Sequence, residues 1–353
     1  MADYRIGGIL QVGVGVPEAS RALRWFRSVL GTDVAVFDDV GEASLMLRYT
    51  GGAAQPRRAV LAVNLQGGGG LEVWQFTRRI PQPPADPVQV GDLGILAVRI
   101  KSRRPRQAHE ALRAAGTSSL GPLSEDPSGR PAFFVRDPLG LPYQVVEAED
   151  WFGTGAHPTG GIAGAMIGVA RIDRSLELYQ RILGYDRLLY DVQGSFPDLS
   201  ALPGGDGRFR RVLLTHTAPW KGPFSGLLGA SSLELVQSLD RTPRRIYEGR
   251  FWGDLGFIHL CFDVGGMDAL KQRLETAGFP FTVDSGGAFA MEDSSGRFAY
   301  IEDPDGTLLE LVETYRLAIL KRWGWFLDLR RRPEGQALPR WMLRALRLNR
   351  IRV

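Results

Sequence analysis

Residues 301–313 read IEDPDGTLLELVE, and residues 135–147 read VRDPLGLPYQVVE. Both stretches place an Asp-Pro-x-Gly turn before an apolar strand that ends on Val-Glu. The copies differ at one chemically important position, because the later strand carries Glu310 where the earlier strand carries Gln144. The chain therefore contains a repeat that keeps its frame while one side chain changes its charge.

Other matching segments extend this repeat along the chain. Residues 14–31 match residues 167–184, and each combines a strand end, a helix with apolar residues three and four positions apart, and a closing glycine. Residues 91–100 likewise match residues 253–264. Four units result, and each predicts a strand, a helix and about three further strands. The units cover residues 7–78, 91–149, 161–240 and 254–315.

The units group into two halves, residues 1–150 and residues 151–315, and a basic extension follows at residues 316–353. Units one and three resemble each other, as do units two and four, which indicates that a doubled chain was doubled again. The extension carries eleven Lys or Arg against two acids, and PRWMLRALRLNR (339–350) has a helical pattern. Its apolar face is expected to pack on the body, and contact with an anionic membrane surface or with nucleic acid is the less favoured interpretation.

The composition indicates a globular protein. Of the 353 residues, 44% are hydrophobic and 23% are charged. No apolar run reaches the roughly 20 residues of a membrane span, and the first residues lack the pattern of an export signal. Cys261 is the one cysteine, which excludes an intrachain disulfide and a thiolate metal cluster. We therefore expect a cytoplasmic protein, either a monomer or a homodimer.

The tandem strand–helix–strand–strand–strand unit resembles the vicinal oxygen chelate superfamily, which includes glyoxalase I, methylmalonyl-CoA epimerase, extradiol dioxygenases and drug-resistance proteins. The resemblance covers nearly the whole chain to residue 315. It implies an α+β fold in which four βαβββ units form two curled mixed-sheet cavities, with metal ligands in the first and last strands of each unit. The segments that carry it are VPEASRALRWFRSVLG (16–31), IDRSLELYQRILGYD (172–186), FVRDPLGLPYQVVE (134–147) and YIEDPDGTLLELVE (300–313).

Carried over one residue at a time, the ligand positions hold different residue types in the four units. Imidazole, carboxylate and amide oxygen suit a divalent Zn, Ni, Co, Mn or Fe ion. Alanine and glycine have no side-chain atom that could bind a metal. The positions are Gln11 and Glu72 in unit one, Ala97 and Gln144 in unit two, Gly164 and Glu234 in unit three, and His259 and Glu310 in unit four.

The residue types leave more than one pairing of the units open. If unit one faces unit four, all four of their positions can bind a metal, and the other cavity has no usable set. If unit three faces unit four, Glu234, His259 and Glu310 form a three-ligand site. The first arrangement is preferred because it gathers the usable residues into one site that resembles the glyoxalase I set. A buried ion pair with arginine is the alternative explanation for an acid inside an apolar strand.

The neighbours of these positions indicate the character of the site. Gly13 and Gly15 share the strand face of Gln11, and we expect them to leave room for a substrate. Trp74 shares the face of Glu72, which indicates an aromatic wall beside the metal.

The resemblance implies one divalent metal ion and proton transfer next to a carbonyl of a small metabolite, as in a lyase or isomerase of the glyoxalase and epimerase kind. The metal polarises a substrate oxygen. Glu310 is expected to serve as base, with Glu72 as its counterpart, while His259 and Gln11 hold the ion. The alternatives are a non-catalytic small-molecule binding protein and an Fe(II)-dependent extradiol-type dioxygenase, whose two histidines and one carboxylate conflict with Gly164. The expected partner is a small-molecule substrate and not a nucleic acid.

Overall fold

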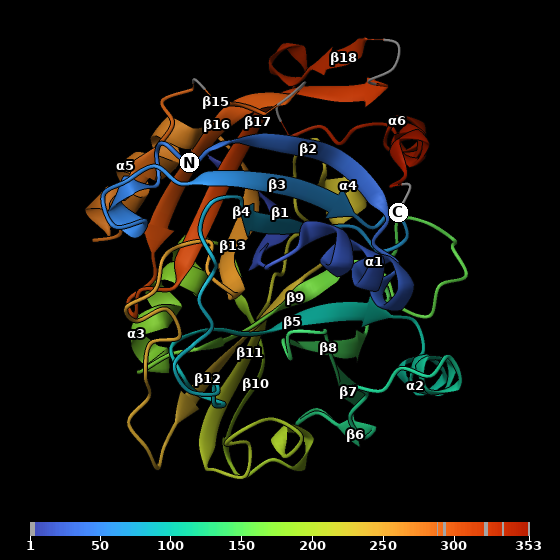
Figure 1. The fold of residues 1–353 in the computed structure, drawn as a ribbon, viewed down its shortest axis with the longest axis vertical. Coiled ribbons are helices and arrows are strands. Elements are labelled where there is room, and N and C mark those ends of the chain that lie inside the picture. Colours follow the sequence, from blue (N-terminus) through green and yellow to red (C-terminus); the bar gives the residue numbers. More distant parts are fainter. Residues whose placement is uncertain (1–3, 288, 292–293, 321–323, 334, 352–353) are drawn as a thin grey trace.

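The computed structural model describes residues 4–287, 289–291, 294–320, 324–333 and 335–351. Two mixed sheets lie one above the other, and most of the helices lie at the outside of the molecule (Figure 1). The fold class is therefore α+β, with two curled sheets, as the sequence predicts. None of the helices in the described part of the chain has the length and hydropathy needed to span a bilayer.

Each of the four units follows the same order of elements, and unit four contains one additional short strand, β15. Unit one consists of β1 (Arg5–Gly15), α1 (Ala19–Leu30), β2 (Val34–Glu42), β3 (Pro56–Val63) and β4 (Gly70–Phe76). Unit two consists of β5 (Gly94–Ser102), α2 (Pro105–Ala114), β6 (Ser124–Glu125), β7 (Pro131–Arg136) and β8 (Pro142–Glu147). Unit three consists of β9 (Ile162–Gly168), α3 (Ile172–Leu176), the π-helical turn η2 (Glu177–Ile182), β10 (Arg187–Gly194), β11 (Phe209–Thr215) and β12 (Ser232–Ser238). Unit four consists of β13 (Gly256–Gly265), α5 (Met267–Thr276), β14 (Val283–Asp284), β15 (Phe289–Met291), β16 (Ser294–Glu302) and β17 (Leu308–Leu320).

Segments between and after the units add smaller elements. Short helices occur within the loops of units one and three, and a further strand and helix follow unit four. The loop elements are η1 (Leu47–Tyr49), η3 (Pro197–Leu199) and α4 (Ser225–Leu228). The extension contains β18 (Trp325–Asp328), η5 (Leu329–Arg331), α6 (Arg340–Ala345) and η6 (Leu346–Asn349). The predicted helix of the extension is present, but the segment before it pairs as a strand with β17.

The repeated Asp-Pro-x-Gly turn is held by the same hydrogen bonds in both copies. The Asp137 carboxylate accepts hydrogen bonds from the backbone amides of Leu139 and Leu141 at 2.8 and 2.9 Å. The Asp303 carboxylate accepts the equivalent bonds from Asp305 and Thr307 at 2.9 and 2.8 Å. The aspartate of this motif therefore closes the turn that leads into the last strand of the unit.

The first unit shares a sheet with the fourth, and the second shares a sheet with the third. The ten-stranded sheet has the order β14-β16-β17-β13-β1-β4-β3-β2, with β15 on β16 and β18 on β17. The eight-stranded sheet has the order β10-β11-β12-β9-β5-β8-β7-β6. Antiparallel pairing of β1 with β13, and of β5 with β9, joins the units within each sheet. The end-to-end arrangement is thus the one the chain adopts, and the pairing of unit three with unit four is wrong.

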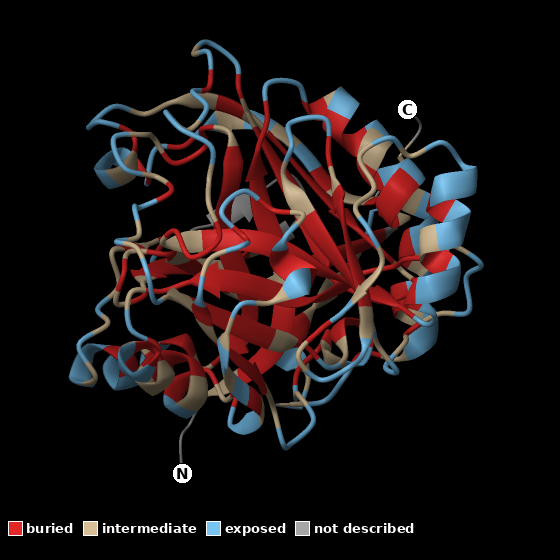
Figure 2. Cartoon of the chain, turned by 90° about the horizontal axis from the view of Figure 1, so that it is seen from below, coloured by how far each residue is buried: buried red, intermediate tan, exposed pale blue. Residues whose placement is uncertain are grey.

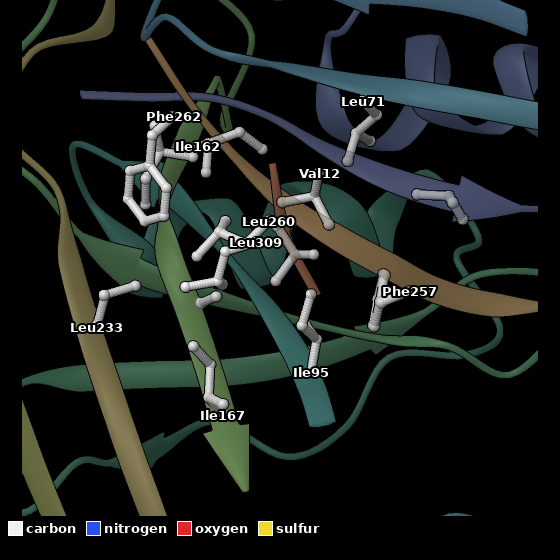
Figure 3. Close-up of a cluster of buried hydrophobic side chains, with 14 of the residues drawn as sticks. Val12, Leu71, Ile95, Ile162, Ile167, Leu233, Phe257, Leu260, Phe262 and Leu309 are labelled. Carbon is white, nitrogen blue, oxygen red and sulfur yellow. The ribbon is translucent and has the colours of Figure 1, made fainter. Parts of the chain in front are cut away.

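The main hydrophobic core lies between the two sheets. Along β1, Val12 and Val14 enter this core, whereas Gln11 lies on the opposite face of the strand. Figure 3 shows the layer, to which Val12, Leu71, Leu260 and Leu309 contribute from one sheet and Ile95, Ile167 and Leu233 from the other. Figure 2 shows that the central strands are largely buried and that the exposed residues lie mainly on helices and loops. One face of each sheet is therefore used for packing, which leaves the other face for a cavity.

Candidate metal centre

Strand register brings the four predicted ligand positions to one place. In the antiparallel pair β1–β13, Gly13 lies opposite His259 and Gln11 lies opposite Cys261. In the parallel pairs, Glu72 of β4 lies beside Gly13, and Glu310 of β17 lies beside Cys261. Because side chains two residues apart share a strand face, all four positions point away from the main core into the same cavity.

The side chains of these residues converge within hydrogen-bonding distance. The His259 Nε2 atom lies 3.2 Å from the Oε2 atoms of both Glu72 and Glu310. The Gln11 side-chain amide donates to Glu72 Oε2 at 2.8 Å and approaches Glu310 Oε2 at 3.5 Å. All four residues are buried. Glu72, His259 and Glu310 can each offer one atom to a common ion, since these atoms lie within 4.8 Å of one another.

The ring of His259 is fixed by its surroundings. A Cβ atom at Gly13 would lie 2.3 Å from the ring, so the glycine leaves room for the imidazole. The expected space for a substrate beside Gly13 is therefore wrong, because His259 fills it. Trp252 stacks against the ring with an interplanar angle of 10°, and the Tyr300 hydroxyl lies 3.4 Å from Nδ1. Nε2 makes no hydrogen bond of acceptable angle to any described residue, although both carboxylates are close.

The electrostatics of the cluster favour a positive charge at its centre. Burial lowers the pKa of His259, but attraction by the Glu310 and Glu72 carboxylates outweighs it and raises the pKa to about 9. Burial raises the pKa of Glu310, and the opposing effect of His259 leaves it lowered. Two buried carboxylates and an imidazole nitrogen that lacks a well-aligned partner match the donor types that divalent transition metals prefer. The residues present therefore fit a metal ion.

A cavity of about 300 Å³ opens beside the cluster. Gln11, Glu72 and Glu310 line it, together with Trp74 and Tyr300. The predicted aromatic wall is thus present. His259 does not line the cavity and lies behind the carboxylates, fully buried. A ligand in the cavity can reach the carboxylates and the position between them, while the imidazole contacts that position from the protein interior.

The corresponding positions of the eight-stranded sheet form an internal ion pair. Glu234 accepts hydrogen bonds from Arg211 at 2.6 Å and from the Tyr190 hydroxyl at 2.8 Å. Arg211 also donates to both oxygens of Asp198 at 2.7 and 2.8 Å. Gln144 accepts from Arg99 at 3.1 Å. The buried ion pair considered as the alternative explanation for an acid in an apolar strand therefore applies to Glu234.

The remaining two positions of this sheet have no ligand function. Ala97 and Met166 are buried in an apolar cluster that fills the space on this side. A Cβ atom at Gly164 would lie 1.7 Å from the Ser232 carbonyl oxygen, so the backbone of β12 occupies the place of a side chain. No group of three His, Cys, Asp or Glu among the described residues gathers here, in contrast to the first sheet.

Several residues of the two sites were not identified from the sequence. Tyr300 lies opposite Glu310 in the β16–β17 pair, and alternation within FAYIE could have placed it on the cavity face. Arg211 stands inside an apolar strand, FRRVLLT, which was a visible signal for a buried ion pair. Trp252 precedes β13 in an irregular segment, where periodicity gives no information. Cys261 is buried, and burial raises the pKa of its thiol well above the ordinary value, which argues against a nucleophile.

The fold and the cluster together define a class: a tandem protein of four βαβββ units in two curled sheets, one of which borders a cavity beside a group of residues that could hold a metal ion. Residues 161–311 match the family model of the Glyoxalase/Bleomycin resistance protein/Dioxygenase superfamily. This match confirms the resemblance to that superfamily over units three and four.

Solved structures share the fold at low sequence identity. Glyoxalase I from Zea mays is 12% identical, and the match covers 88% of this chain and 92% of that chain with a TM-score of 0.53. A "putative dioxygenase" from Bacillus subtilis subsp. subtilis str. 168 is 15% identical, and the match covers 88% of this chain and 86% of that chain with a TM-score of 0.53. No curated protein matches the sequence. These structural similarities concern the fold only, so the reaction has to be inferred from the residues of the site.

Proposed function

We propose that the chain is a metal-dependent lyase or isomerase that moves a proton next to a carbonyl group of a small metabolite. The observation that supports this proposal is the convergence of Glu72, Glu310 and His259 Nε2 on one buried position beside a cavity. A cavity that only bound a molecule would need no such cluster, because burying two carboxylates around a single imidazole is costly.

The metal ligands in this proposal are Glu72, His259, Glu310 and Gln11. A bound divalent ion, whether Zn, Ni, Co, Mn or Fe, would act as a Lewis acid toward a substrate oxygen. The Gln11 amide donates its N–H to Glu72 Oε2 at 2.8 Å. A half-turn of this amide group would present its oxygen atom to the same position, and glutamine oxygen is a suitable metal ligand.

Glu310 is the base in this proposal. Its side chain is 10% exposed, compared with 4% for Glu72, so it is the carboxylate that a ligand in the cavity can reach more readily. Its oxygen can take a proton from a carbon held beside it, and Glu72 on the opposite strand holds the ion while this happens. His259, which does not line the cavity, can serve only as a ligand.

The donor set distinguishes this proposal from a ring-cleaving dioxygenase. An Fe(II) dioxygenase of that kind uses two histidines and one carboxylate. The cluster among the described residues has one histidine and two carboxylates, which is the ratio expected when a carboxylate serves as the base.

Metal analysis of the purified protein tests the proposal. We expect one divalent ion per chain, measured by inductively coupled plasma mass spectrometry against protein concentration. His259→Ala should lose the ion, and Gln144→Ala in the other sheet should retain it. Two ions per chain, or loss of the ion from Gln144→Ala alone, would overturn the proposal.

A further inference from the structure

The cavity beside the metal cluster has walls that restrict what can enter it. We propose that its ligand is a small molecule with an oxygen-rich head and a short hydrocarbon chain or ring, and not a metabolite carried on a polyionic group such as a peptide thiol or a nucleotide. This inference rests on the proposed function, because the head is the part that would meet the metal centre.

The walls of the cavity are mostly apolar, and the polar lining residues outside the metal cluster are Glu42, Ser44, Arg57, Ser295, Tyr300 and Thr314. Arg57 is the one basic residue among the described residues that line it. The Arg57 guanidinium already donates to the backbone carbonyl and the carboxylate of Asp39 and lies over the Trp74 ring. A carrier with two carboxylates or with phosphates needs several unpaired cations, and this cavity does not supply them. The apolar walls include Leu10, Phe37, Met46, Leu61, Phe224 and Leu227.

The size of the cavity sets a second limit. Its volume of about 300 Å³ lies at the small end of the range for ligand pockets, roughly 300–1,000 Å³. A cavity at the small end of this range suits a head group of a few atoms together with a short chain or one ring.

Part of the apolar wall of the cavity comes from segments outside the repeated strands and helices of the four units. Phe224 and Leu228 come from the segment around α4, which connects β11 to β12 of unit three. Leu317 lies at the far end of β17, and Leu346 lies in η6 of the extension, where it is 3% exposed. The extension thus supplies part of the cavity wall, and its position fixes the length of chain that fits.

Binding of straight-chain alkyl hydroxamic acids to the metal-loaded protein tests the inference. The hydroxamate group binds divalent metals through two oxygens, and chain length can be varied from two to eight carbons. We expect the affinity to rise about three- to fourfold per methylene, which corresponds to ~0.8 kcal/mol each, until the cavity is full. Quenching of the fluorescence of Trp74 and Trp252, which both line the cavity, provides the measurement.

Two pairs of variants locate the chain within the cavity. Leu346→Ala enlarges the cavity, so the affinity should continue to increase for about two further methylenes of chain length. Leu348→Ala is the control, because Leu348 is 63% exposed and does not line the cavity, and this variant should leave the dependence on chain length unchanged. Leu45→Lys places a charge at a lining position that is 47% exposed, and it should reduce the increase in affinity with chain length. Leu47→Lys, which is 43% exposed outside the lining, is its control. The second pair tests the inference even if Leu346→Ala fails to fold.

The outcomes separate this inference from the proposed function. Equal affinity for short and long hydroxamates, or tighter binding of a glutathione-linked hydroxamate than of an alkyl hydroxamate, would overturn the inference and leave the metal site standing. Equal binding to metal-loaded and metal-free protein would overturn the proposed function, while a rise with chain length would still support the apolar cavity. Failure of every hydroxamate to bind the metal-loaded protein would overturn both.

Discussion

Glu234 and Glu310 occupy equivalent positions in units three and four, yet their partners differ. Glu234 is neutralised by Arg211, whose attraction overcomes the effect of burial and lowers the pKa of the Glu234 carboxyl group. Glu310 instead lies beside Glu72 and His259 and borders a cavity. A buried carboxylate requires a positive partner. The same residue type is thus structural where arginine supplies the charge, whereas in the proposed function Glu310 acts as ligand and base beside an ion.

Replacing Glu310 with glutamine tests its proposed role as base. Glu310→Gln keeps the shape and an oxygen ligand but removes the proton acceptor, so we expect partial retention of metal and a loss of activity of about 10²–10⁴-fold. The measurement is exchange of the substrate's α-proton with solvent deuterium, after a screen of 2-oxoaldehyde adducts, acyl thioesters and catechols with wild-type protein. Gln144→Glu is the matched control and should not alter the rate. Full activity in Glu310→Gln would exclude this residue from the mechanism.

Replacing Arg211 tests the ion pair of the other sheet. Arg211→Met removes the hydrogen-bonded counter-charge of Glu234 and Asp198 and leaves Arg99 as the remaining cation near Glu234, and we expect the free energy of unfolding to fall by about 3–5 kcal/mol. Arg210→Met removes the neighbouring partner of Asp173 and Asp191 at the surface, and should cost no more than about 1 kcal/mol. Urea denaturation of both variants provides the comparison. Equal losses would mean that the buried pair contributes no more than the surface pairs.

At the scale of elements, the close pairing of β1 with β13 decides where His259 can lie. A Cβ atom at Gly13 would overlap the imidazole ring. We expect Gly13→Ala to displace the ring and to lower metal content more than stability, as measured by metal analysis alongside thermal unfolding. Gly41→Ala in β2, where the nearest atom to a new Cβ is 3.4 Å away, is the control and should retain the metal. A Gly13→Ala protein with a full metal complement would contradict the proposed role of the glycine.

Much of this arrangement could be predicted from the sequence, because local patterns repeat. The units, the turn aspartates and the strand faces follow from periodicity, and the end-to-end pairing followed from the types of residue at four positions. Contacts between distant segments could not be derived in this way. Nothing in the pattern of Trp252 shows that it stacks on His259, and the strand β18 lies in an extension that was expected to be helical. Such contacts depend on tertiary packing, which overrides local preference.

Lys101 links the two sheets. It lies in β5 and donates to the carbonyl of Gly67, in the loop after β3, at 2.7 Å and to the carbonyl of Leu228, at the end of α4, at 2.9 Å. Burial lowers the pKa of its amine from 10.5 to about 8, although Asp150 opposes the change. Burial of the charged amine therefore destabilises the folded state, and the hydrogen bonds to carbonyl groups offset part of this destabilisation.

This pKa predicts how stability depends on pH. Below about pH 8 the amine is charged in both the folded and the unfolded chain, so its effect is constant. Between about 8 and 10.5 the folded protein releases a proton that the unfolded chain retains, and the free energy of unfolding should rise by up to ~3 kcal/mol. Urea denaturation across this range measures the slope, and Lys101→Met should remove that part of it. An unchanged slope in the variant would refute the assignment.

The pairing of β1 with β13 also affects the order in which the protein assembles during synthesis. During synthesis, the strand that carries Gln11 emerges early, whereas its neighbour with His259 emerges roughly 12–50 s later at ~5–20 residues per second. Until then β1 has one edge without a partner, which is a site for wrong pairing between nascent chains. The central units are consecutive and can complete their sheet during this delay. The proposed metal site can thus form only after the fourth unit has left the ribosome, and an ion cannot meet its full set of ligands before that point.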